Sequence, residues 1–380
     1  MAPKNYAAYL VKAGAIPLEV KPAPYTAPGP EEIVVKNAAL AINPVDYTKQ
    51  HGGDQMFTWI KYPHILGSDV AGEVVEVGKG GQAEKLYKLG DRVLGFAASL
   101  DKRSAGAPEG AFQHYTVLRS HLATKIPDDL SYERACVLPM SLSTATCGLF
   151  KRDYNALEYP TTSPKSQDQT PTSTFIVWGG SSSVGCSAIQ LAKAAGYEVI
   201  ATASPKNFGL VKELGASQVY DYKDPDTPAM IIAALKEKTC AGAIAIGNGS
   251  LEACINILSA VPGNGRKFVA QTTVPINPAK MPKNFLKVMG VMLGFLWWNI
   301  KISLSSKFKG VETKFIWAPD VIADEVGGMI YQDFLPKALA SGQFQVKPEP
   351  QVVGHGLECV QEAMDTNLRG VSATKVVVTL

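Results

Sequence analysis

Residues 174–203 read TFIVWGGSSSVGCSAIQLAKAAGYEVIATA, and this stretch decides the fold. An apolar, β-rich run at 175–178 meets a turn of glycine and serine at 179–183. A stretch with helical spacing of its apolar residues follows and stops at Gly196, and a second apolar run begins at Tyr197. Strand, turn, helix and strand within about 30 residues is the length of one βαβ unit. The stretch therefore predicts an α/β fold with a doubly wound parallel sheet.

The turn itself is a candidate phosphate site. Glycines let the backbone approach a pyrophosphate closely, and the start of the following helix offers free N–H groups and a favourable dipole. The spacing departs from G-x-G-x-x-G, since Ser181 stands where the second glycine is usual. On this pattern alone, an ordinary turn in an α/β unit remains the alternative.

The end of the second strand favours one dinucleotide over the other. An NAD-binding fold usually carries Asp or Glu about 20 residues after the glycines, whereas residues 203–207 read ASPKN and contain no acid. The hydroxyl of Ser204, the cation of Lys206 and the amide of Asn207 suit a 2′-phosphate, and Tyr222 is placed to close the same pocket. We therefore predict NADPH as the cofactor, with a solvated loop lysine as the alternative for Lys206.

Length and composition narrow the class further. A chain of 380 residues predicts two domains, and its net charge of +3 without a basic block argues against nucleic acid as a partner. The first residues show no apolar signal core, and six cysteines without a C-x-x-C pair fit reduced thiols, so we expect a cytoplasmic protein. The apolar run 288–298 is too short to span a bilayer, and no membrane association is expected. We expect it to form a buried helix between domains, or to line an apolar pocket or substrate channel.

The remaining segments follow the same plan. Short β runs near 32–36, 72–77 and 91–95, punctuated by glycine and proline, predict a compact, partly open β barrel. Residues 131–150 are predicted to be helical, and 155–173 to be a solvated loop. After residue 174, strands and helices alternate. Because ligands bind at the carboxyl ends of such strands, the turn at Gly247 is expected to face the nicotinamide half of the cofactor.

Several stretches in order along the chain resemble the medium-chain dehydrogenase/reductase superfamily. They are INPVDYTKQ at 42–50, LGSDVAGEVVEVG at 66–78, LGDRVLGFA at 89–97, GAFQHYTVL at 110–118, KIPDDLSYERACVLPMSLSTATCGL at 125–149 and GVSATKVVVTL at 370–380. The resemblance implies a GroES-like, partly open β-barrel domain formed by 1–150 and 341–380. It implies a Rossmann domain with a doubly wound parallel sheet, formed by 151–340.

Within this superfamily, the chain most resembles zinc-free fungal members, namely the trans-acting enoyl reductases of polyketide synthases and the related proteins called zinc-binding alcohol dehydrogenase domain-containing. SPKNF at 204–208 and VYDYKD at 219–224 carry that likeness. It implies a set of cofactor-binding residues, namely Gly180, Ser181, Ser182, Ser183, Val184, Ser204, Lys206, Asn207, Tyr222, Gly247 and Val269.

The residue types predict no metal. Zinc-dependent relatives use an early Cys, a G-H-E motif and a later Cys, but here these positions read 41–44 AINP, 67–69 GSD and Ser141 or its neighbours. The segment 96–108, where a structural-zinc loop would carry four cysteines, has none. Catalytic zinc needs about three nitrogen, sulfur or oxygen ligands from the protein, and this set is missing. The histidines show no H-x-H or H-x-x-x-H spacing and are interpreted as ordinary surface or core residues.

Without a metal, the developing enolate of a reduced enone must be stabilised by hydrogen-bond donors. Six residues of two motifs are the candidate catalytic residues, namely Asn43, Asp46, Tyr47, Thr48, Lys49 and Thr144. Related enoyl reductases carry a lysine where Thr48 stands, and Lys49 follows it here. Alternatives stay open: Asn43 as a turn cap, Asp46 as an orienting or structural acceptor, Tyr47 as a core residue, and Thr144 as a hydroxyl bonded to its own helix.

The sequence therefore predicts a zinc-independent, NADPH-dependent oxidoreductase of the enoyl or quinone reductase type. It would transfer hydride to the β carbon of an activated C=C bond in an enone, a quinone or an enoyl thioester. An NADPH-dependent aldehyde or ketone reductase, a trans-acting enoyl reductase partner of a polyketide synthase, and a non-catalytic NADPH-binding protein are the alternatives. The substrate is a small molecule or a carrier-bound acyl chain, and the protein is expected to be a monomer or a homodimer.

Overall fold

A computed structural model describes residues 3–162, 173–261, 265–282 and 284–380 of the chain. The chain forms two compact units. The first joins Met1–Ser143 to Pro319–Leu380, and the second is Thr144–Ala318. Most of the predicted loop at 155–173 lies outside the described residues.

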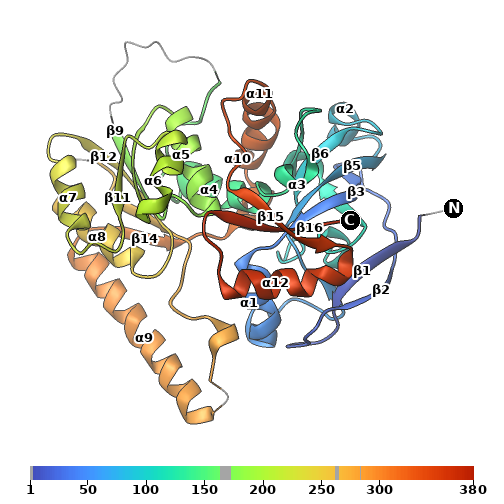
Figure 1. Cartoon of the computed structure of the whole chain (residues 1–380), viewed down its shortest axis with the longest axis horizontal. Helices are drawn as coiled ribbons and strands as arrows, with labels where there is room; N and C mark the ends of the chain where they lie inside the picture. Colours follow the sequence, from blue (N-terminus) through green and yellow to red (C-terminus); the bar gives the residue numbers. More distant parts are fainter. Residues whose placement is uncertain (1–2, 163–172, 262–264, 283) are drawn as a thin grey trace. The chain divides into compact units, whose positions relative to one another are not determined.

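The second unit is built on a six-stranded sheet whose strands all pair in parallel, in the order β11-β10-β9-β12-β13-β14 (Figure 1). This is the strand order of a doubly wound sheet, and the opening stretch predicts a sheet of this type. The elements of this unit are β9 (Ser173–Trp178), α5 (Ser183–Ala194), β10 (Glu198–Ala203), α6 (Phe208–Glu213), β11 (Gln218–Asp221), α7 (Thr227–Ala234), β12 (Thr239–Ala245), α8 (Ser250–Ala260), β13 (Phe268–Gln271), α9 (Phe285–Phe308) and β14 (Glu312–Phe315).

The first unit contains a seven-stranded mixed sheet and a smaller three-stranded one. Its strands are β1 (Asn5–Leu10), β2 (Glu19–Ala23), β3 (Glu32–Ala41), β4 (His64–Ile65), β5 (Asp69–Val77), β6 (Arg92–Phe96), β7 (Tyr115–Arg119), β8 (Ala123–Lys125), β15 (Glu349–His355) and β16 (Thr374–Thr379). Its helices are α1 (Pro44–Gly52), α2 (Gln82–Leu86), α3 (Tyr132–Ala135), α10 (Glu325–Gly328), α11 (Leu335–Ala340) and α12 (Val360–Arg369). The C-terminal strand β16 pairs with β3 and β15, so the end of the chain completes the sheet of the N-terminal part (Figure 1). The α/β fold class is confirmed, with one unit of the GroES-like type and one built on a parallel sheet.

The predicted helical stretch 131–150 is two helices, α3 and α4 (Pro139–Phe150). Ser131 caps the first of them by accepting a hydrogen bond from the backbone N–H of Arg134. The second begins at Pro139, because a proline is tolerated in the first turn of a helix but not in its interior. Residues 320–340 likewise form short helical pieces, among them α10 and α11.

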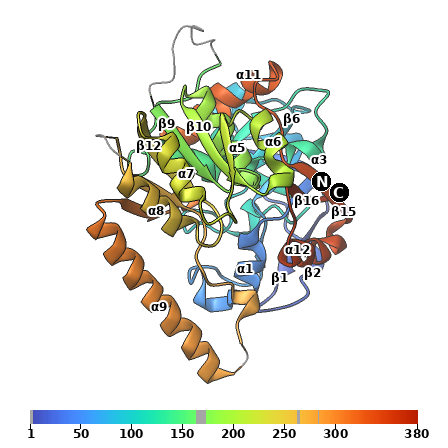
Figure 2. The same cartoon turned by 60° about the vertical axis from the view of Figure 1, so that its left-hand side comes forward.

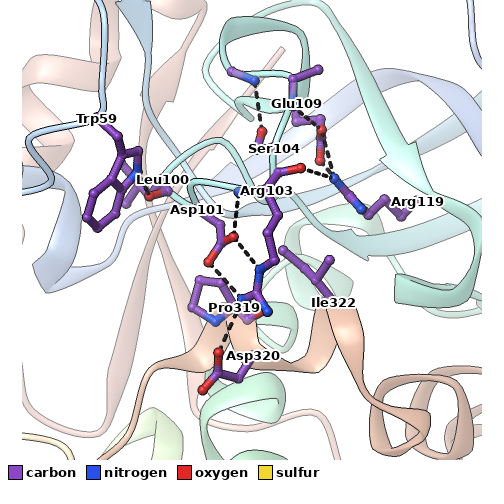
Figure 3. A network of polar contacts seen from close by, with 12 residues as sticks. Trp59, Leu100, Asp101, Arg103, Ser104, Glu109, Arg119, Pro319, Asp320 and Ile322 are labelled. Atoms are coloured by element: carbon purple, nitrogen blue, oxygen red, sulfur yellow. Dashed lines mark hydrogen bonds and ion pairs between the residues drawn. The ribbon is translucent and has the colours of Figure 1, made fainter.

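Residues 319–340 belong to the first unit, although the sequence assigned them to the cofactor domain. Figure 3 shows the contacts that hold the start of this segment. Arg103 donates to the carbonyl of Pro319 and to the carboxylate of Asp320, both at 3.1 Å, while its guanidinium also pairs with the buried Asp101. Further along, Gln332 donates to Tyr87 Oη at 2.8 Å. These contacts join residues that are far apart in the chain, so the local sequence pattern does not predict them.

The apolar run that we expected to be buried forms most of α9, a helix of 24 residues, and here the prediction is wrong. Ile302 is the one buried residue in it, and ten large apolar side chains on it are exposed. By length and composition α9 is the one helix among the described residues that could cross a membrane, a property that it shares with core helices of soluble proteins. Figures 1 and 2 show it leaving the sheet of its unit beside α8.

A substitution tests how tightly the glycine turn is packed. Gly185→Ala is expected to lower the free energy of unfolding by about 1 to 3 kcal/mol, because the new Cβ would lie 2.2 Å from the carbonyl oxygen of Gly179. The midpoint of chemical unfolding measures the effect. Gly209→Ala is the control, since a Cβ there meets nothing within 4 Å inside helix α6. Equal effects of the two substitutions would contradict the close packing.

Candidate active site

The glycine turn lies between β9 and α5. Gly179 adopts a φ of +91°, which a side chain disfavours, and its N–H donates to Thr202 Oγ1 on β10 at 3.0 Å. Ser182 caps α5, because its hydroxyl accepts from the N–H of Gly185 at 3.0 Å and donates to the carbonyl of Gly179 at 2.8 Å. The other N–H groups of the first helical turn have no partner within the helix. The turn formed by Gly180, Ser181, Ser182, Ser183 and Val184 therefore has the form of a phosphate cradle.

The residues expected to select the cofactor gather at the carboxyl ends of β10 and β11. These two strands pair in parallel, with Ala203 opposite Asp221, so the residues that follow each strand lie at one edge of the sheet. Ser204 donates to Tyr222 Oη at 3.3 Å, and Asn207 donates from its side-chain amide to Ser181 Oγ at 3.2 Å. Asn207 thus connects this loop to the glycine turn. Lys206 is exposed and makes no ion pair with a described residue.

The two remaining cofactor predictions differ in their placement. Gly247 follows β12 with a φ of +98°, and its N–H donates to Thr273 Oγ1 at 3.0 Å. Val269 lies in the middle of β13 and is fully buried in the hydrophobic core of the unit. Its side chain is committed to that core, whereas Thr272 and Thr273 occupy the end of the strand where ligands bind.

In the first unit, Asn43 and Asp46 belong to a buried polar network at the start of α1. Asp46 accepts a hydrogen bond from the backbone N–H of Asn43 at 2.7 Å and so caps the helix. Asn43 is the N-cap residue, and its side chain also reaches two charged groups. It donates to Asp69 Oδ2 at 2.8 Å and accepts from Lys375 Nζ at 2.5 Å. Both the NH2 group and the carbonyl oxygen of this amide are therefore bound to buried charged groups.

Asp69 and Lys375 form the buried ion pair at the centre of this network. Their N–O distance is 2.8 Å, and their side chains are 0% and 4% exposed. The N–H of Met140 at the start of α4 donates to the other carboxylate oxygen of Asp69 at 2.5 Å. Burial raises the pKa of Asp69, and the Lys375 ammonium opposes that shift. The ion pair thus brings the last strand, the start of β5 and two helix N-termini to one point.

Asp46 is the second carboxylate in this buried network. Burial raises the pKa of Asp46 from 3.8 to about 7, with the charge of Asp69 adding to the shift and the backbone N–H of Asn43 opposing it. The buried network contains two carboxylates, those of Asp46 and Asp69, but only the one ammonium of Lys375. Keeping both carboxylates ionised away from water is therefore unfavourable. Asp46 consequently holds a proton over much of the acidic range.

The side chains of the next three residues of α1 differ in how deeply they are buried. Tyr47 and Thr48 are half-buried, and burial together with the charge of Asp46 raises the pKa of the Tyr47 phenol. Lys49 is fully buried, and its ammonium donates to the carbonyls of Gly53 and Met56 at 2.8 and 2.7 Å. Burial lowers the pKa of Lys49. Lys49 therefore fixes the loop after α1 through two of its three N–H donors.

Thr144 lies inside α4 and is 8% exposed. It is the first residue of the second unit, whereas the five other candidate catalytic residues belong to the first. The neighbouring Ser143 is fully buried and shares a hydrogen bond of 2.8 Å with Tyr331 Oη. The hydroxyl of Ser143 therefore has a structural partner in its own unit.

The positions where zinc-dependent relatives carry metal ligands lie in segments that are held here by ion pairs. Asp69 stands in the G-S-D segment and is neutralised by Lys375, and no group of three His, Cys, Asp or Glu side chains suited to a metal gathers in the described parts of the chain. The segment 96–108 is held by the Arg103–Asp101 pair and by Arg119, which binds Glu109 at 3.1 Å (Figure 3). Ion pairs thus stabilise a loop that carries no cysteine.

Sequence reasoning missed three residues of these sites. Asp69, Lys375 and Thr202 each sit in or beside a quoted motif, but their partners are distant in the chain, up to 332 residues for Lys375 and Asn43. A buried lysine inside the apolar strand KVVVTL was the one available signal, since an unpaired lysine is rarely buried.

Comparisons with known proteins agree with this arrangement. The family model described as alcohol dehydrogenase GroES-like domain matches residues 29–128, and the one described as zinc-binding dehydrogenase matches 183–295. The chain is 48% identical to dehydrogenase pigH of Monascus ruber over the full length of both chains. The chain belongs to the medium-chain dehydrogenase/reductase superfamily.

Members of this superfamily are oxidoreductases that bind a nicotinamide cofactor. The chain is 36% identical to trans-enoyl reductase himH of Aspergillus japonicus, covering 98% of this chain and 97% of that one. Among solved structures, the CurK enoyl reductase shares the fold with a TM-score of 0.70 at 17% identity, covering 99% of each chain. The GroES-like and Rossmann-type architecture of a medium-chain dehydrogenase/reductase is thereby confirmed.

Removing the lysine of the ion pair tests its structural role. Lys375→Met is expected to lower the free energy of unfolding by about 3 to 5 kcal/mol, because Asp69 is left as an uncompensated buried charge. Adding Asp69→Asn should restore part of this loss. Lys347→Met is the control, since its ion pair with Glu349 lies at the surface and is worth at most about 1 kcal/mol. The midpoint of chemical unfolding is measured for the wild type, both single variants, the double variant and the control, and strictly additive effects of Lys375→Met and Asp69→Asn would contradict the pair.

The proton on Asp46 predicts a pH dependence of stability. The folded state keeps a proton up to about pH 7 that the unfolded state loses near 3.8. The stabilisation is thus complete below the unfolded pKa and is lost as the pH rises through the folded one. Relative to Asp46→Asn, the wild type should lose up to about 4 kcal/mol of unfolding free energy between pH 4 and 7. Chemical unfolding across this range measures the difference, and parallel curves would contradict the raised pKa.

Proposed function

We propose that the chain is a zinc-independent, NADPH-dependent reductase of activated C=C bonds, acting on an enone, a quinone or an enoyl thioester. The observation that carries the cofactor assignment is the cluster of Ser204, Asn207 and Tyr222 beside the glycine turn, with the Lys206 cation on the same loop. No carboxylate stands directly after β10, where an NAD-binding fold places one.

The residues fit the two phosphate-bearing parts of NADPH. The N-terminus of α5 offers its free N–H groups and its dipole to a pyrophosphate. The loop 204–207 offers hydroxyl, ammonium and amide donors to a 2′-phosphate, which has no counterpart in NADH. When bound, NADPH supplies the hydride.

In the first unit, Tyr47 and Thr48 are the proposed hydrogen-bond donors for the oxygen of the developing enolate. The raised pKa of Tyr47 keeps its phenol protonated, so it donates a hydrogen bond at neutral pH. Asn43 and Asp46 act as positioning residues, because their side chains are committed to the buried network that sets the start of α1. Lys49 and Thr144, both buried, are left without an assigned chemical step.

The nature of the reaction rests on this donor arrangement and on the named relatives. Reduction of a C=C bond conjugated to a carbonyl needs donors at the oxygen but no metal. Asp69, in the segment where zinc-dependent relatives carry G-H-E, pairs with the ammonium of Lys375. The relatives named trans-enoyl reductases favour an acyl chain carried by a synthase as the substrate, with a polyketide synthase as the partner.

We propose a cytoplasmic location for the enzyme. An NADPH-dependent aldehyde or ketone reductase on the same residues is the rival activity.

Nucleotide binding provides the first test. Lys206→Ala is expected to weaken NADPH binding by about 10- to 100-fold, since a hydrogen bond to a charged group contributes about 1.5 to 3 kcal/mol. NADH binding should stay unchanged, because it lacks the 2′-phosphate. Titration followed by nucleotide fluorescence measures both affinities. Lys212→Ala, an exposed lysine on the next helix, is the matched control.

The same preparations then separate the reactions. With NADPH saturating, the wild type should consume the nucleotide with an enone, quinone or enoyl thioester and not with the corresponding saturated aldehyde, and a deuterated cofactor should label the β carbon. A loss of affinity that is equal for both nucleotides would overturn the cofactor assignment. Preferential turnover of the aldehyde would replace C=C reduction by the rival activity.

A further inference from the structure

Helix α9 has two apolar faces, of which one is used within its own unit. On the inner face, Trp298 and Ile302 pack with the core that lies under α8, and Trp298 Nε1 donates to Glu252 Oε1 at 2.7 Å. Phe295 stacks on Trp298 with ring centroids 6.0 Å apart. These contacts fix the orientation of the helix, and they leave the opposite face exposed.

The exposed face carries a regular seam, which we call the outer seam. It consists of five residues spaced alternately three and four apart, namely Leu286, Met289, Leu293, Leu296 and Ile300. All five are exposed, from 43% at Ile300 to 74% at Leu286. Alternating spacings of three and four place side chains on one stripe of a helix, and this is the pattern by which two helices pack against each other. A helix is therefore the partner shape that the outer seam fits.

The exposed apolar surface is large enough for a stable interface. Ten large apolar side chains of α9 are exposed, five of them in the outer seam and five beside it. At about 200 Å² for a large side chain and roughly half to three quarters exposure, they present on the order of 1,000 Å². Monomeric proteins rarely expose patches above about 300 to 600 Å², whereas a standard interface buries about 800 Å² on each partner.

The polar residues beside the seam distinguish a protein partner from a membrane. A helix lying on a membrane pairs one apolar face with a broad charged face directed to water. In α9 the face opposite the outer seam is instead apolar, and Trp298 and Ile302 on that face pack on the protein core. Its charged residues are Lys287, Lys301 and Lys307, and no acid occurs between residues 272 and 311. Three lysines do not form the broad cationic face of a membrane-surface helix.

We propose that the outer seam of α9 binds the outer seam of a second copy of this chain, so that the protein forms a homodimer through paired helices. A two-fold axis brings the same surface of each copy together, which makes an apolar stripe its own complement. In such a dimer each outer seam packs against helix α9 of the other copy. About 1,000 Å² of apolar surface per copy is available for burial. This interface does not depend on the proposed catalytic function.

Sedimentation of the full-length chain tests the interface. The wild type is expected to sediment as a dimer in the micromolar range, and Leu293→Glu with Leu296→Glu to raise the dimer dissociation constant at least about 100-fold, because four carboxylates would be buried in the paired seam. Both side chains are exposed in the single chain, so the fold should be retained, as circular dichroism and thermal unfolding would verify. Leu89→Glu is the matched control, since Leu89 is 67% exposed in the other unit.

Three outcomes would overturn the proposal. A wild type that remains monomeric shows that the seam has no copy of itself as partner, and a dimer that survives the double substitution shows that another surface joins the copies. Flotation of the wild type with vesicles rich in anionic lipid, lost on changing Lys287, Lys301 and Lys307 to Glu, would assign α9 to a membrane surface.

Discussion

The buried ammonium of Lys375 joins three elements of the first unit. It meets Asp69 and Asn43, which come from the start of β5 and the start of α1, while Lys375 itself lies on the last strand. A buried charge without a partner costs several kcal/mol, so these three elements must assemble together. The unit therefore depends on residues from both ends of the chain. Because Asn43 precedes α1 directly, the same contact sets the position of Tyr47 and Thr48.

The second unit is constrained by backbone contact more than by charge. Gly185 has no room for a Cβ against the carbonyl of Gly179, and Thr202 holds the N–H of Gly179 from the neighbouring strand. These contacts fix the direction of α5 relative to β9, and with it the direction of the helix dipole. Ser204 and Asn207 then reach Tyr222 and the turn through hydroxyl and amide groups. This turn and the polar loop beside it are the basis of the proposed binding of NADPH.

The sequence was most informative where function depends on local order. The βαβ unit, the glycine turn and the absence of an acid after β10 are all visible in about 30 consecutive residues. It was least informative where a side chain has two possible uses. Asn43 was weighed as a turn cap, and it does form a capping box with Asp46, but its amide also binds the buried ion pair. Lys49 was a candidate donor to substrate, yet two carbonyls of its own loop occupy its ammonium.

The sequence by itself determined the fold class, the position of the glycine turn and the family, because each is encoded by the spacing of neighbouring residues. Tertiary structure alone decided which polar groups are paired, since the partners of Asn43, Asp69 and Gln332 lie tens to hundreds of residues away. It also decided the exposure of α9. Hydrophobicity indicates that a helix should be covered on both faces, but it does not say whether the cover comes from the same chain.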